Sequence, residues 1–356
     1  MRVAGERARA QRGTPPRPSL DPYARAMEGM LAAVQMAWSP DDYASADAFA
    51  ARVLALTRRA TEGAAGAPVL VAFPELVGLP LLLTAAGDER ALRAPSVDAA
   101  LLRLVRRHVG RWHASAWRHR RFGLGAIYTT YGVDAFIAYR DAFVAAARDT
   151  NAVIVAGSAF LPVVDEEPSA GLHIVDGRTR NVSLVVDAGG ILGWAAKVHL
   201  SRGREARAAL HRGRLADLHP FETPFGRVGV AVCLDAFFEG VVGTLDGRGA
   251  RVLVQPSAND APWDRPWPPD PSRREGEVWL ARGMRERLQG RTHLRYGVNP
   301  MMVGDLLGMR PRGRSSIVAN VAATGLGADA EPPGVLAIAP DAQHEAIVRV
   351  RVPLPN

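Results

Sequence analysis

Cysteine and lysine are almost absent from this chain of 356 residues. The single cysteine, Cys233, cannot form an intrachain disulfide, and it excludes a zinc or iron–sulfur site built from several thiolates. We therefore expect a reducing, cytoplasmic location. Long apolar runs are absent too: none approaches the roughly 20 residues that a membrane-spanning helix needs, so no transmembrane helix is predicted.

The scarcity of lysine has a second implication. Only Lys197 accompanies 43 arginines, so Arg serves as the general surface cation of this protein. Arg carries a wide planar fork, whereas Lys is a compact point charge that fits a narrow pocket. The retained lysine therefore indicates a position that a guanidinium cannot fill, with a surface lysine retained by chance as the alternative.

The positive charge is unevenly distributed. The formal net charge is +8, and residues 1–26 contain six arginines against two acidic residues, so half of the excess lies there. This segment has four prolines and no hydrophobic periodicity, which indicates a disordered tail or a mis-called start upstream of Met27. It lacks the apolar core of a secretory signal. We expect one folded domain over 27–356.

Short Val-rich apolar runs alternate with helix-length segments from Met30 onward. Continuous apolar runs are typical of strands that are covered on both faces, so the pattern predicts α/β layers. No glycine-rich phosphate loop is present. The expected strands are 30–36, 68–73, 152–157, 182–187, 227–232, 251–255, 298–303, 314–319 and 345–352, and the expected helices include 43–62, 134–149 and 271–289.

Three polar residues follow apolar strand-like runs. Glu75 comes after the run 68–73, Lys197 ends the segment ILGWAAK, and Cys233 comes directly after the run 227–232. Ligands bind at strand ends in α/β sheets because side chains converge there. Taken singly, each residue also has a structural interpretation: a buried cysteine is a small core residue, and a glutamate beside a proline stabilises a helix N-terminus.

Together, and in this order, Glu75, Lys197 and Cys233 resemble the nitrilase superfamily of carbon–nitrogen hydrolases, whose members place these three residue types at successive strand ends. A further glutamate follows the lysine by eight residues in many members, and Glu205 stands there. The resemblance covers nearly all of 30–352 and implies a single domain with a four-layer α-β-β-α sandwich fold. Its motifs are AVQM in 30–36, TPFGRVGVAVCLD in 223–235, VQPSAN in 254–259 and GRSSIVANVAATG in 313–325.

The chain departs from the family in two places. Members usually continue after the aspartate that corresponds to Asp235 with a pattern containing Arg, Pro and Glu, whereas this chain reads AFFEG, so the substrate contact typical of that Arg is missing. The interval between Glu75 and Lys197 is longer than the family norm, which predicts a helical insertion at about 85–133.

The expected insertion contains the strongest run of basic residues. Seven arginines and three histidines lie between 103 and 121 with no acidic residue. Apolar positions from Leu101 to Trp112 recur at helical spacing and predict a basic amphipathic helix. We interpret it as a solvated helix packed by one face, and do not expect contact with nucleic acid or membrane. A lid, a subunit contact or docking to an anionic surface are the alternatives. The histidines lack acid or Cys partners, so we expect no metal.

The resemblance implies a mechanism without a cofactor. Glu75 would take the proton of the Cys233 thiol, and Lys197 would hold both groups ionised. Lys197 and the backbone N–H of Leu234 would stabilise the oxyanion of an acyl-cysteine pathway. Glu205 would orient Lys197 or the water that attacks the acyl-cysteine.

The expected function follows from these residues. We predict a hydrolase that cleaves the C–N bond of a small amide or carbamoyl substrate, and Leu234-Asp235 after the cysteine favours the amide side of the family. The alternatives are a nitrilase, an N-acyltransferase, or an inactive binding protein that uses the basic insertion. We expect a homodimer or higher homo-oligomer.

Overall fold

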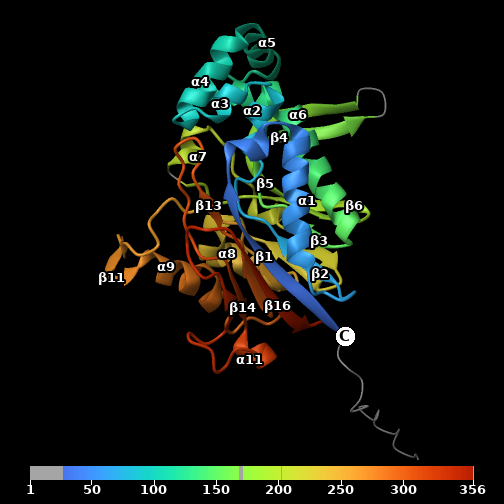
Figure 1. The fold of residues 1–356 in the computed structure, drawn as a ribbon, viewed down its shortest axis with the longest axis vertical. Coiled ribbons are helices and arrows are strands. Elements are labelled where there is room, and N and C mark those ends of the chain that lie inside the picture. The colour runs from blue at the N-terminus through green and yellow to red at the C-terminus, as the bar shows by residue number, and fades with distance from the viewer. Residues whose placement is uncertain (1–26, 168–170, 202, 356) are drawn as a thin grey trace, which may run out of the picture.

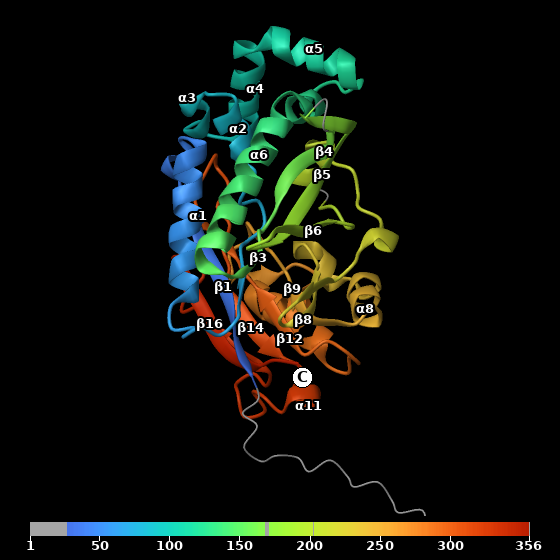
Figure 2. The same ribbon diagram turned by 90° about the vertical axis from the view of Figure 1, so that its right-hand side faces the viewer.

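The computed structural model describes residues 27–167, 171–201 and 203–355, so the expected tail 1–26 lies outside the described residues. Two β-sheets pack face to face, and helices cover their outer sides (Figure 1). The view turned by 90° shows α1 and α6 on one side and α8 on the other (Figure 2). This arrangement is the four-layer α-β-β-α sandwich that the family resemblance implies.

The first sheet has eight strands in the order β13-β1-β2-β3-β5-β4, with β16 beside β1 and β6 beside β5. β1, β2 and β3 are parallel, as expected for strands connected through helices. The strands are β1 (Glu28–Trp38), β2 (Val69–Ala72), β3 (Val153–Val155), β4 (Ala159–Glu167), β5 (Gly171–Asp187), β6 (Gly190–Ala196), β13 (Met302–Gly304) and β16 (Ala346–Pro353).

The second sheet has six strands in the order β15-β14-β12-β9-β8-β7, and a separate hairpin joins β10 and β11. Its three central strands, β8, β9 and β12, are parallel. The strands are β7 (Phe221–Thr223), β8 (Gly226–Val230), β9 (Ala250–Val254), β10 (Pro266–Trp267), β11 (Asp270–Arg274), β12 (Tyr296–Asn299), β14 (Ser316–Ala319) and β15 (Val335–Ile338).

Helices cover both sheets. α1 and α6 pack on the first sheet, and α8 and a π-helical segment, Trp279–Arg285, pack on the second. No helix in the described part of the chain is long and apolar enough to span a membrane. The α-helices are α1 (Ala46–Thr61), α2 (Leu81–Ala85), α3 (Glu89–Leu92), α4 (Val97–Arg107), α5 (Val109–His119), α6 (Leu124–Thr150), α7 (Arg204–Arg207), α8 (Glu239–Gly247), α9 (Glu275–Val278), α10 (Glu286–Leu288) and α11 (Val321–Thr324).

Successive side chains of β1 point alternately into two hydrophobic cores, which explains why the strand is apolar throughout. Leu31 and Ala33 belong to the core between the two sheets, whereas Ala32 and Val34 belong to the core under the outer helices. A strand that is buried on both faces has no solvent side, so it carries no polar alternation. β1 therefore forms part of both hydrophobic cores.

Two expected elements differ from the observed ones. The expected strand 298–303 is divided at Pro300 and Met301, and its halves, β12 and β13, lie in different sheets. Pro300 has no N–H to donate, so a sheet ladder cannot continue through it. The expected helix 271–289 begins with strand β11 and then continues through α9, the π-helical segment and α10.

The expected amphipathic helix over residues 101–112 is wrong in one respect, because it is broken at His108. This residue has φ −126° and ψ 37°, and it separates α4 from α5. Its ring packs edge-to-face on Tyr131 of α6, with ring centroids 5.9 Å apart. Gly110, a poor helix former, follows two residues later. That the segment 85–133 is an insertion stays a prediction.

Candidate active site

Glu75, Lys197 and Cys233 meet at one place although they come from three strands. Glu75 follows β2 and Lys197 follows β6 in the first sheet, whereas Cys233 follows β8 in the second. The Nζ atom of Lys197 lies 2.7 Å from Oε1 of Glu75 and 3.0 Å from Oε2 of Glu205. Glu75, Lys197 and Glu205 are 2–3% exposed and Cys233 is 8% exposed. The structure thus brings together all four predicted side chains.

Cys233 is the first residue of a short 3₁₀ helix, Cys233–Phe237 (η3), and lies at a strained turn after β8. Its φ of 52° lies in the left-handed region, which costs a residue with a side chain about 1–3 kcal/mol. Two hydrogen bonds hold the turn: the Cys233 N–H donates to the carbonyl of Pro256 at 2.8 Å, and Gln255 donates to the carbonyl of Cys233 at 2.9 Å. A conformation this specific at a buried thiol indicates a functional site.

The turn that carries Glu75 depends on the segment after β3. Ser158 accepts the N–H of Leu76 with its hydroxyl at 3.1 Å and the N–H of Gly78 with its carbonyl at 3.0 Å. Gly157 has φ 67°, and a Cβ there would lie 2.1 Å from the carbonyl oxygen of Pro74. Only glycine therefore allows this close approach, which sets the position of Glu75.

Asn181 is a site residue that the sequence interpretation missed. Its side-chain amide donates to Oε1 of Glu75 at 2.9 Å and to Oε1 of Glu205 at 2.8 Å. The N–H of Ser201 donates to the other oxygen of Glu205 at 2.7 Å. Asn181 and Lys197 therefore bridge the same two carboxylates. The available signal was a polar residue directly before the apolar run 182–187.

Asp235 connects the lysine segment to the cysteine turn. Its buried carboxylate accepts the N–H of Val198 at 2.8 Å and the N–H of His199 at 2.7 Å. It also contacts Nδ1 of His199 at 2.9 Å, and the His199 ring stacks on Phe238 with centroids 3.7 Å apart. Asp235 therefore links the residues that follow Lys197 to those that follow Cys233.

Burial controls the charges of the site. Burial alone would lower the pKa of Lys197, but Glu75, Cys233 and Glu205 together raise it, so the ammonium keeps its proton. Burial raises the pKa of Glu75, and Lys197 opposes that rise. Burial and the Glu75 carboxylate both raise the pKa of the Cys233 thiol. The resting site thus favours a neutral thiol hydrogen-bonded to Glu75, rather than the ionised pair expected from the sequence.

A raised thiol pKa predicts the pH dependence of alkylation. Only the thiolate reacts, and its pKa lies above the ordinary 9.0, so the rate of iodoacetamide labelling should still be rising at pH 9. Intact-protein mass spectrometry follows one label, because Cys233 is the only cysteine. N-acetylcysteine in the same buffers serves as the control, because it shows how the alkylation rate of an unperturbed thiol depends on pH. A labelling rate that already levels off near neutral pH would contradict the neutral resting thiol.

Asp235 provides a second prediction. Asp235→Asn removes a carboxylate oxygen that accepts backbone N–H groups and places an amide donor against one of them. Lys197 should then shift, and a displacement of about 1 Å can cost about 10²-fold in rate. We expect a fall of that size in kcat. His199→Phe is the control: it leaves both backbone contacts of Asp235 intact and should lose far less, and equal losses would contradict the linking role.

The backbone N–H of Leu234 is available to a ligand. Among the described residues it makes no hydrogen bond, whereas its neighbours at 233 and 235 donate to carbonyl groups. An N–H at the start of a short helix, beside a cysteine and an ammonium, can bind a developing oxyanion.

A chamber of about 360 Å³ is lined by residues that follow two of the site residues closely in the chain. Its walls include Leu79, which follows Glu75 by four residues, and Ala208, which follows Glu205 by three. The first turn of α4 and Tyr128 and Phe160 form other walls, and the lining is about equally polar and apolar. Its volume falls in the range of small-molecule sites. In the described part of the chain, no cluster of three or more His, Cys, Asp or Glu side chains could hold a metal ion.

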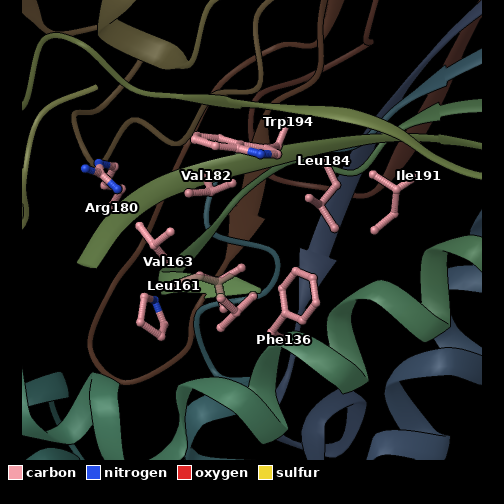
Figure 3. A pocket seen from close by; sticks show the side chains of 10 residues that line it. Phe136, Leu161, Val163, Arg180, Val182, Leu184, Ile191 and Trp194 are labelled. Carbon is pink, nitrogen blue, oxygen red and sulfur yellow. The ribbon is translucent and has the colours of Figure 1, made fainter. Parts of the chain in front are cut away.

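A smaller apolar cavity of about 110 Å³ lies on the outer side of the first sheet. Figure 3 shows it between α6, which supplies Phe136, and strands β4, β5 and β6, which supply Leu161, Arg180 and Trp194. Arg180 precedes Asn181 on β5, and adjacent strand residues face opposite sides of a sheet. This cavity contains none of the four predicted site residues, and we assign it no part in catalysis.

The layered fold and the buried Glu, Lys and Cys cluster define the class of the protein: a nitrilase-type α-β-β-α sandwich. The family model for carbon-nitrogen hydrolases matches residues 30–272. The chain therefore belongs to the carbon–nitrogen hydrolase family, within the nitrilase superfamily that the sequence resembles. No curated protein matches.

Solved structures of this superfamily share the fold at low sequence identity. A carbon-nitrogen hydrolase from Helicobacter pylori is 17% identical, with a TM-score of 0.58 over 92% of this chain and 90% of that chain. Nit3 of Saccharomyces cerevisiae, a member of branch 10 of the nitrilase superfamily, is 16% identical, with a TM-score of 0.54 over 92% and 91%.

A third structure carries a covalent adduct. A mutant of the amidase from Nesterenkonia sp. AN1 shows covalent addition of the acetamide moiety of fluoroacetamide at the active site cysteine. It is 19% identical to this chain, with a TM-score of 0.54 over 92% of this chain and 91% of that chain. Identities this low establish the shared fold, while substrate and mechanism have to be argued from the site.

Proposed function

We propose that this protein hydrolyses the C–N bond of a small amide or carbamoyl compound through an acyl-cysteine intermediate. The observation that supports the proposal is the arrangement of the buried cluster. Lys197 is 2.7 Å from Glu75, and Glu75 is hydrogen-bonded to the only thiol of the chain. A base, a nucleophile and a cation are thus grouped within one water-poor site, with the base in contact with both of the others.

The first half-reaction uses the thiol proton. Glu75 accepts it as Sγ of Cys233 attacks the substrate carbonyl carbon, so a neutral thiol at rest is the reactant that this step requires. Lys197 and the N–H of Leu234 stabilise the oxyanion of the tetrahedral intermediate. As the C–N bond breaks, protonated Glu75 gives its proton to the leaving amine, and a thioester remains on Cys233.

The second half-reaction returns the enzyme to its starting state. Glu75 takes a proton from water, which attacks the thioester carbonyl. The C–S bond then breaks, the acid product leaves, and Glu75 returns the proton to the thiolate. Asn181 and Glu205 keep Glu75 and Lys197 in place through both halves, because Asn181 donates to Glu75 and Glu205 pairs with Lys197.

The experiment compares substrates that carry the same alkyl group. An amide, a carbamoyl compound and a nitrile are incubated with the protein, and intact-protein mass spectrometry measures the adduct while a second assay measures ammonia or amine release. We expect an adduct and turnover from the amide or carbamoyl compound. Turnover of the nitrile alone would indicate a nitrilase, and transfer to added hydroxylamine without hydrolysis would indicate an acyltransferase.

Cys233→Ala is the control for that experiment and should carry no adduct. An adduct of equal yield on this variant, or no adduct and no turnover with any compound of the panel, would contradict the proposed function.

A further inference from the structure

One end of the molecule carries an exposed surface that catalysis does not use. α4 and α5 form the end opposite the C-terminus in both ribbon views (Figures 1 and 2). Large apolar side chains there are exposed: Trp117 by 73%, Phe122 by 61%, Val109 by 52% and Leu102 by 49%. Together with the exposed arginines at 106, 107, 118 and 120 we call these residues the α4–α5 surface.

The positive charge of this surface is uncompensated. No acidic residue occurs from 99 to 133, and in the described part of the chain its four arginines form no ion pair. Other arginines of the same segment are engaged: Arg103 pairs with Asp88, and Arg121 contacts His211. The free arginines are therefore those that point away from the domain.

The apolar residues of the surface are not part of the hydrophobic core. In α5, Ala116 is buried and Trp112 packs against the core, whereas Val109 and Trp117 are exposed. The rings of Trp117 and Phe122 contact each other edge-to-face with centroids 5.9 Å apart, and both stay exposed. Exposed aromatic rings beside arginines are typical of helices that lie at a membrane interface.

We propose that the α4–α5 surface docks on an anionic phospholipid bilayer. Its arginines attract acidic head groups, and Trp117, Phe122, Val109 and Leu102 enter the head-group region. This proposal departs from the expectation drawn from the sequence, in which the basic helix is only a solvated face. What the structure adds is the exposure of four large apolar residues beside the unpaired arginines.

Charge and chemistry favour a bilayer over other partners. A second copy of the same face would bring like charges together, which opposes its association. A nucleic acid would satisfy the arginines and could stack on Trp117, but it offers nothing to the aliphatic side chains of Leu102 and Val109. A bilayer of acidic lipids satisfies both the charged and the apolar parts. The proposal does not depend on the proposed function.

The test measures sedimentation of the full chain with phosphatidylcholine vesicles, with and without phosphatidylglycerol. We expect binding only to the phosphatidylglycerol vesicles, and we expect it to weaken between about 0.1 M and about 1 M salt, as the Debye length falls from about 10 to about 3 Å. Replacing Arg106, Arg107, Arg118 and Arg120 by Gln should weaken binding at least about tenfold, since each cation near an acidic surface adds to the attraction.

Matched variants separate this surface from general charge and hydrophobicity. Trp117→Ala should weaken binding, whereas Trp194→Ala, at a tryptophan that is 50% exposed on β6, should not. A quadruple Arg-to-Gln control elsewhere on the surface, at positions 58, 59, 227 and 351, makes the same charge change and should bind like wild type.

Several outcomes would overturn the proposal. They are an absence of vesicle binding, equal binding to neutral and anionic vesicles, an equal loss in the matched controls, and binding to DNA or RNA but not to vesicles. Thermal melting of each variant verifies that it is folded, so a loss of binding reports on the surface.

Discussion

Cys233→Ala should abolish turnover, with a loss of at least about four orders of magnitude in kcat, because removal of a covalent nucleophile has effects of this size. No other thiol exists to replace it. The melting temperature should stay near that of wild type. The change removes one sulfur atom, and alanine pays the same backbone cost as cysteine at φ 52°. Steady-state kinetics and a thermal melt measure the two quantities.

Cys233→Ser tests the same step more finely. It keeps a hydroxyl of similar size, but a hydroxyl is a weaker nucleophile than a thiol, so activity should remain severely reduced. Uncatalysed hydrolysis at the same substrate concentration is subtracted from each rate. A corrected turnover of Cys233→Ala within about tenfold of wild type would refute the acyl-cysteine pathway.

Lys197→Arg should lose at least about 10²-fold in kcat, since a catalytic group displaced by about 1 Å can lose that much. The Nζ atom contacts two carboxylate oxygens at 2.7 and 3.0 Å in a site where Lys197 is 2% exposed. A guanidinium is wider than an ammonium and spreads its charge over a plane. It would pair with the carboxylates but could not also occupy the narrow position that faces the substrate oxygen.

The stability of Lys197→Arg shows whether a loss of activity comes from a displaced cation or from unfolding. The net charge is unchanged, and the larger side chain should cost about 1–3 kcal/mol of unfolding free energy through overpacking, so the variant should fold. Arg107→Lys is the converse control on the exposed face of α4, where either cation is solvated, and it should change hydrolysis little. Wild-type kcat in Lys197→Arg would remove Lys197 from the mechanism.

Local patterns predicted the α/β layers and three of the polar side chains of the site, and the family resemblance implied the four-layer sandwich and Glu205. A run such as 30–36 is apolar without alternation only if both of its faces are buried, and β1 belongs to both cores. Glu75, Lys197 and Cys233 stand out because each follows such a run. The single lysine among many arginines added an independent signal, and Lys197 is the buried cation of the cluster.

The remaining features follow from contacts between distant parts of the chain. Asn181 bridges Glu75 and Glu205 because β5 lies at the right place in the first sheet, and nothing near Asn181 in the sequence indicates that pairing. Pro300 breaks a run that looked continuous and divides it between two sheets.

The break at His108 and the exposure of Trp117 also depend on how α4 and α5 pack. A local pattern determines whether a segment forms a strand or a helix and which residues share a face. Which face meets which neighbour is decided only when the layers pack, because that choice minimises the exposed apolar area of the whole chain. For this protein the sequence by itself determined the fold and the catalytic candidates, and the tertiary structure decided their contacts, their charges and the exposed basic surface.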